Sequence, residues 1–90
     1  QSSDHGALTS LAEQRISDVR ATPNFSGLEA AYNGTEASLT GFPGYTRVTN
    51  IVHTGGPRPT FTNDYKTVTI TVSTLALKTP VTKTVVVAAP

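Results

Sequence analysis

The sequence predicts an α+β domain in which one N-terminal helix packs on an antiparallel sheet of three to four strands. Near the N-terminus, apolar side chains recur at every third or fourth position, which is the spacing of one face of a helix. The last third of the chain is rich in valine and threonine, and apolar and hydroxyl side chains alternate there as in a half-buried strand. Neither a short helix nor a two-stranded ribbon is stable alone in water, so we expect each to cover the other.

The clearest strand is predicted over residues 65–74. One of its faces is largely apolar and carries Lys66, Val68, Ile70 and Val72, whereas the other carries hydroxyl groups. A second strand is predicted over residues 81–88, where β-branched side chains suit a pleated surface. We place the hairpin turn between them within residues 75–80, because Pro80 has no N–H to donate and marks the edge of the turn.

The helix is predicted over residues 7–21, after a polar lead-in in which Ser3 or Asp4 could act as its cap. Thr22-Pro23 ends it, because the residue before a proline is disfavoured in the α conformation. The residues expected to form the helix–sheet packing are Leu8, Leu11, Ile16 and Val19 on the helix and Val68, Ile70 and Val72 on the sheet.

Residues 22–44 are predicted to be largely irregular. A short helical segment is expected around residues 28–32, with Phe25 as its anchor, and Leu39 and Phe42 are expected to point inward. Asn33-Gly34 is a turn signal, which also explains the match of Asn33-Gly34-Thr35 to the glycan acceptor pattern.

A third strand is predicted over residues 45–54, with a bulge near Asn50 where the alternation slips. Tyr45, Val48, Ile51 and Val52 supply its apolar content. Residues 55–63 form a long connector. A chain of 90 residues holds one core, so all of these elements are assigned to a single domain, residues 1–90.

Composition argues against several classes of function. A net charge of +1 provides no basic face of the kind that binds nucleic acid. Cysteine is absent, which removes disulfides, thiolate nucleophiles and sulfur ligands. The longest apolar run, residues 85–89, is far shorter than the roughly 18–20 residues that span a bilayer. The chain opens on a polar segment without an initiator methionine, so we expect an upstream part to have been removed.

No catalytic, cofactor-binding or metal-binding residue is predicted, and we do not expect an enzyme. His5 and His53 have no neighbour at a recognised ligand spacing, and the segment from Thr54 to Pro57 lacks the spacing of a phosphate-binding loop. The acidic residues are scattered and are expected to be solvated surface groups: Asp4, Glu13, Asp18, Glu29, Glu36 and Asp64. A small hydrolase is a remote alternative, since no nucleophile and base can be named.

Two segments carry a family resemblance. The segment ALTSLAEQRISDVRATPNFSGL, with Leu11-Ala12, Ile16 and Arg20, resembles the end of the long N-terminal helix of type IV pilin-like proteins. The similarity is strongest to minor pseudopilins of type II secretion and to PilV-type minor pilins. The segments DYKTVTITVS and PVTKTVVVA resemble the C-terminal strands of that family. The family's leader-peptidase site, its N-terminal Phe, its Glu at the fifth position and its apolar helix half are not in this sequence.

The resemblance implies a pilin-like head and a structural role, as a minor subunit of a type IV pilus or a type II secretion pseudopilus. It implies assembly with other pilin or pseudopilin subunits through an N-terminal helix half that this chain lacks. It also implies a precursor held in the inner membrane of the bacterial cell envelope, with this domain in the periplasm. The alternative is a secreted β-rich adhesin or ligand-binding module, suggested by the threonine faces and by the connector over residues 55–63.

Overall fold

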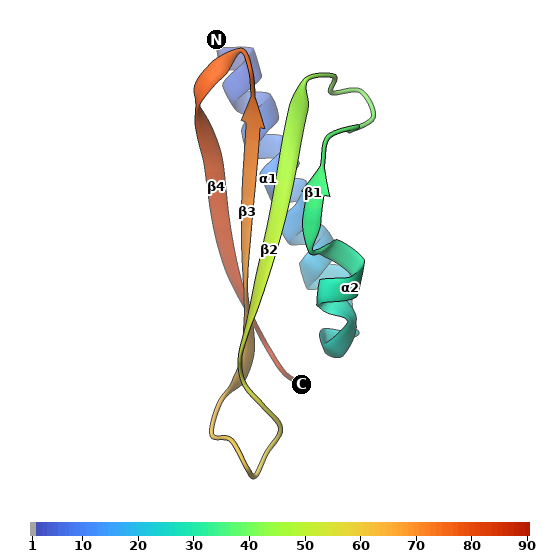
Figure 1. Cartoon of the computed structure of the whole chain (residues 1–90), viewed down its shortest axis with the longest axis vertical. Coiled ribbons are helices and arrows are strands. Elements are labelled where there is room, and N and C mark those ends of the chain that lie inside the picture. Colours follow the sequence, from blue (N-terminus) through green and yellow to red (C-terminus); the bar gives the residue numbers. More distant parts are fainter. Residues whose placement is uncertain (1) are drawn as a thin grey trace.

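The computed structural model describes residues 2–90 and shows an N-terminal helix packed on one face of a four-stranded antiparallel sheet (Figure 1). The predicted α+β class, with a helix on an antiparallel sheet, is confirmed. The strands follow one another in space in the order of the sequence, β1-β2-β3-β4. The elements are α1 (Ser2–Ala21), η1 (Phe25–Gly27), α2 (Leu28–Tyr32), β1 (Gly34–Glu36), β2 (Tyr45–Gly55), β3 (Asp64–Thr74) and β4 (Leu77–Ala88).

Helix α1 begins at Ser2, so the prediction of a non-helical lead-in capped by Ser3 or Asp4 is wrong. Residues 2–6 contain no proline, and polar residues are tolerated in the first turns of a helix that later turns anchor by packing. The helix ends at Ala21 as expected, and the Thr22 hydroxyl donates to the carbonyl oxygen of Asp18 at 2.8 Å. Among residues 2–90, no helix combines the length and the apolar content required to cross a bilayer.

The core lies between α1 and the inner face of the sheet. Helix α1 packs mainly against β3 and β4. In Figure 1 it runs obliquely behind the strands, from beside the β3–β4 turn toward α2. Of the residues predicted to form this packing, Ile16 is partly buried against the core, and Leu8, Leu11, Val19, Val68, Ile70 and Val72 are buried. Leu28 of α2 is also fully buried, and Phe25, Leu39 and Phe42 pack against the core from the connecting segments.

The β3–β4 turn is shorter than predicted. Thr74 pairs with Leu77, so the turn consists of Leu75 and Ala76, and Pro80 lies inside β4 instead of ending the turn. β4 has β3 as its one partner in the described sheet, and an edge strand accommodates a residue that has no N–H. The register shifts between Val72 and Thr74, which places the irregularity next to Pro80.

β2 pairs with β3 without interruption from Tyr45 to Gly55, so the predicted bulge near Asn50 is wrong. The apparent slip in alternation arises because the buried positions of β2 include two polar residues, Arg47 and Thr49. Val48 and Val52 consequently lie on the opposite face and are exposed.

The short strand β1 falls in a region that was predicted to be a turn followed by irregular chain. It pairs with the middle of β2, and its last residue, Glu36, lies opposite Arg47. Just before it, the Asn33 side chain accepts a hydrogen bond from the Ile51 N–H at 2.9 Å. Asn33 therefore continues the edge contact of β1 along β2.

Candidate functional site

The face of the sheet that α1 covers contains charged side chains among its apolar ones. Arg47 of β2 and Lys66 of β3 are 5% and 3% exposed, and Arg15 of α1 is 8% exposed. Each of these cations is neutralised by a glutamate from the segment between α1 and β2. The helix–sheet interface is therefore the most highly organised polar region among the described residues.

Arg47 connects three elements. Its guanidinium donates to Glu36 through Nε to Oε1 at 3.0 Å and through Nη2 to Oε2 at 3.2 Å, which is a bidentate pair. Its Nη1 donates to the Leu11 carbonyl oxygen and to the Gln14 side-chain oxygen, each at 3.1 Å. A single side chain of β2 thus joins β1 to the middle of α1.

Arg15 approaches the same glutamate from the helix. Its Nη2 lies 3.0 Å from Glu36 Oε1, and its guanidinium carbon lies 4.9 Å from the centre of the Tyr32 ring. The hydrogen bonds from Arg47, with the charge of Arg15, hold the pKa of Glu36 below its ordinary value of 4.5, although burial alone would raise it. Glu36 is therefore an anion shared by two buried guanidinium groups.

Lys66 forms the second charged cluster, near α2. Its ammonium donates to the Phe25 carbonyl oxygen at 2.6 Å and to Glu29 Oε1 at 2.5 Å, and it lies 4.5 Å from the centre of the Phe25 ring. The hydrogen bond from Lys66 lowers the pKa of Glu29 below 4.5. This cluster fixes η1 and α2 onto the end of the sheet.

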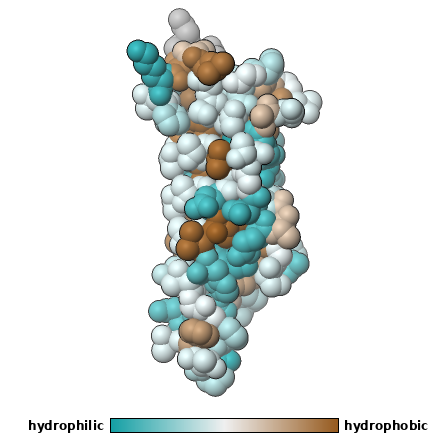
Figure 2. Space-filling view, in the orientation of Figure 1, coloured by the Kyte–Doolittle hydropathy of each residue, from teal (hydrophilic) through white to brown (hydrophobic). Residues whose placement is uncertain are grey.

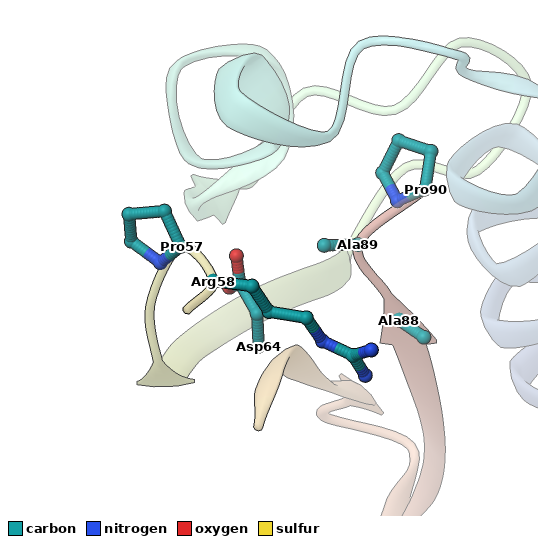
Figure 3. A pocket seen from close by; sticks show the side chains of 6 residues that line it. All are labelled: Pro57, Arg58, Asp64, Ala88, Ala89 and Pro90. Carbon is teal, nitrogen blue, oxygen red and sulfur yellow. The ribbon is translucent and has the colours of Figure 1, made fainter. Parts of the chain in front are cut away.

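An open hollow lies where the β2–β3 loop approaches the C-terminal residues (Figure 3). Its volume is about 430 Å³, and its lining consists of Pro57, Arg58, Asp64, Ala88, Ala89 and Pro90. The Asp64 carboxylate is engaged by His53, whose Nε2 lies 2.6 Å from Asp64 Oδ1. The His53 ring also packs edge-on against Phe25, with 5.7 Å between the ring centres.

In the sequence His53 has no neighbour at a recognised ligand spacing, but in the structure its ring is paired with the carboxylate of Asp64. The β2–β3 hairpin brings the two residues together, since Gly55 pairs with Asp64 and His53 pairs with Lys66. A His–Asp pair is part of many acyl-transfer sites, but the lining of this hollow supplies no hydroxyl or thiol nucleophile. Within residues 2–90, no three His, Cys, Asp or Glu side chains are grouped so as to hold a metal ion.

The second face of the sheet, opposite α1, is not covered by any other described element; we call it the open sheet face. It consists of the outward residues of the four strands, among them Val48, Thr67, Thr69, Thr71 and Thr84. Figure 2 shows that pale side chains with a few brown ones cover much of the upper half of this face, whereas teal side chains project at the upper left and surround the brown ones near the middle. This face is a candidate contact surface.

Comparison of the chain with protein-family models, with curated proteins and with solved structures gave no match.

Proposed function

We propose that this chain is the periplasmic head of a minor type IV pilin or of a minor type II secretion pseudopilin. In this proposal the chain is a structural subunit, and its role is assembly. It would join other pilin or pseudopilin subunits through an apolar helical segment preceding α1, which also anchors the precursor in the inner membrane. In this proposal the protein resides in the bacterial cell envelope.

The observation that supports the proposal best is the position of α1 on the sheet. The N-terminal end of α1 lies beside the β3–β4 turn, whereas the β2–β3 loop lies at the opposite end of an elongated molecule measuring 50 × 21 × 17 Å (Figure 1). A helical segment continuing upstream would leave the head at one end. Such a segment could pack in a filament core while the sheet remains outside.

The charged clusters support a structural role for the same region. Arg15 and Arg47 join α1 to β1 and β2, and Leu8 and Val19 are buried against the sheet. A force applied along α1 would therefore be distributed to the sheet through both apolar packing and hydrogen bonds. A filament subunit that is anchored through its helix requires such a firm connection between the helix and the sheet.

The test is the fate of the natural full-length protein in its own bacterium. We expect the precursor to be shortened by the leader peptidase that processes pilins, and the mature protein to be recovered in sheared filaments or cross-linked to other pilin subunits. The matched control is a strain lacking that peptidase, in which the precursor should keep its length and stay in the inner membrane. A cleavable secretory signal ending just before Gln1, with release of the domain, would contradict the proposal.

The alternative, a secreted adhesin or ligand-binding module, is favoured by one observation, the hydroxyl-rich open sheet face with the loop beside it. Binding of the isolated domain to glycans or surfaces tests it. That binding should be lost when residues 56–62 are shortened and should be unaffected by substitution of exposed α1 residues such as Ser17.

A further inference from the structure

We propose that the open sheet face is the contact surface for a second copy of this chain, packed sheet against sheet. The first observation is the absence of charge over the middle of this face. By register, Arg47, Lys66 and Lys83 all lie on the face that α1 covers, and the outward residues of the regular β2–β3–β4 pairing, from Tyr65 to Thr71 and their partners, carry no charge. Lys78 is exposed in β4, but it lies outside this stretch, at the irregular end near the β3–β4 turn. A sheet face that remains in water normally carries charged side chains, whereas the centres of interfaces are depleted of them.

The second observation is that the face is complementary to itself. Thr69 and Thr71 of β3 lie opposite Thr84 and Thr82 of β4, and the Thr71 and Thr82 hydroxyl oxygens are 3.4 Å apart. Because a hydroxyl group both donates and accepts hydrogen bonds, two identical threonine surfaces can satisfy each other without any matching of charge. A twofold dimer requires this property of its interface.

Valine side chains supply the apolar part of the same surface. Val52 and Val86 flank Thr67 across the sheet and are 53% and 60% exposed, and Val48 is 37% exposed. These side chains gain from burial against a second sheet, which would pack at a distance of about 10 Å. A second copy provides the same valines in return.

The size of the face sets the expected strength of the contact. Strands β2, β3 and β4 have 11, 11 and 12 residues. With a rise of about 3.4 Å per residue and a spacing of about 4.8 Å between strands, they present about 500 Å² per copy. Two copies would bury about 1,000 Å², which is at the lower limit for a specific interface, so we expect a weak dimer. The proposed dimer involves the domain alone and does not depend on the proposed role in a filament.

Sedimentation velocity on the domain between about 10 µM and about 1 mM tests the proposal. We expect the sedimentation coefficient to rise with concentration from that of a monomer toward that of a dimer. Thr69→Lys, at the centre of the face, should weaken association by at least about tenfold because it buries an unpaired charge. The matched control is Ser17→Lys, which adds the same charge on the exposed surface of α1 and should leave association unchanged.

Thr84→Lys on edge strand β4 is the second variant, and circular dichroism verifies that each variant keeps its fold. A monomer at about 1 mM would overturn the proposal, and so would a dimer retained by the folded threonine variants or weakened equally by Ser17→Lys. A monomer that binds a glycan, and loses that binding in Thr69→Lys, would assign the face to a ligand instead.

Discussion

Arg47 and Glu36 lie directly opposite each other in the β1–β2 pair, and their side chains form a bidentate ion pair with N–O distances of 3.0 and 3.2 Å. The same guanidinium reaches the Leu11 carbonyl oxygen in α1. Arg47 is 5% exposed, so its charge depends on these partners instead of on water. The connection from β1 through Arg47 to α1 therefore depends on the carboxylate of Glu36.

Glu36→Gln should destabilise the domain by about 1–3 kcal/mol. The substitution leaves two buried guanidinium groups, Arg15 and Arg47, without their shared anion, and the partial exposure of Glu36 keeps the cost below that of a fully buried pair. Urea unfolding followed by circular dichroism measures the change. Glu13→Gln, on the exposed side of α1, is the matched control and should have almost no effect. Equal midpoints for the two variants would show that water replaces Glu36.

Stability should fall in acid, below the ordinary glutamate pKa of 4.5. The pKa values of Glu29 and Glu36 are lowered in the folded state, chiefly by hydrogen bonds from Lys66 and Arg47 respectively. Carboxyl groups with a lowered pKa stabilise the fold above the unfolded value, and this stabilisation is lost as the pH falls through the folded value. Urea midpoints at pH 7, 5 and 3 should therefore be similar for the first two and lower for the third. Glu36→Gln should reduce the loss between pH 5 and pH 3, and an unchanged loss would contradict the assignment.

The Lys66 cluster predicts that removing the cation is less harmful than removing its anion. Lys66→Met retains the packing of the side-chain stem and leaves Glu29 free to reach water, so a change of less than about 1 kcal/mol is expected. Glu29→Ala leaves an ammonium that is 3% exposed, and the Phe25 carbonyl and ring are then its remaining partners among the described residues, at a cost of about 1–3 kcal/mol. In the double variant, the second substitution should add little to Lys66→Met. The reverse order of the two single effects would contradict this account.

Replacing Thr49 is expected to stabilise the domain, whereas the substitutions above destabilise it. Its side chain is 1% exposed, and its hydroxyl oxygen has no hydrogen-bond partner among the described residues. Thr49→Val preserves the shape and removes the unsatisfied group, so we expect stabilisation by about 1 kcal/mol. Thr46→Val, at an outward position of the same strand, is the control for the general effect of valine in a strand. If both variants gain equally, strand propensity is the cause and the Thr49 hydroxyl has no cost.

Strand β3 shows what the sequence could predict, and β2 shows why prediction failed elsewhere. In β3 the buried positions are Lys66 and three aliphatic residues, so alternation identified the inner face correctly, including the buried lysine. In β2 the inner face holds Arg47, Thr49 and Ile51, whereas Val48 and Val52 lie outside. Hydropathy alone therefore does not identify which side of β2 faces the helix.

The charged clusters could not be predicted, because their anions come from chain segments with weak local patterns. Glu36 is placed by a three-residue strand whose partner begins only after the connection over residues 37–44. His53 and Asp64 meet because a hairpin returns the chain, and their spacing in the sequence resembles no known motif. Single-sequence periodicity describes which face of an element is apolar, but it does not describe which distant carboxylate will neutralise a buried cation.

Two glycines with nearly the same backbone conformation should respond differently to alanine. Gly41 and Gly55 have φ values of 82° and 83°, a region that costs an L-residue about 1–2 kcal/mol. A Cβ on Gly41 would meet nothing within 4 Å, whereas a Cβ on Gly55 would lie 1.8 Å from the Asn63 carbonyl oxygen, which accepts the Gly56 N–H at 2.9 Å. Gly41→Ala should therefore cost about 1 kcal/mol, and Gly55→Ala clearly more, because it opens the base of the β2–β3 loop. Urea unfolding of both variants isolates the steric part, and equal losses would show that the loop shifts freely around residue 55.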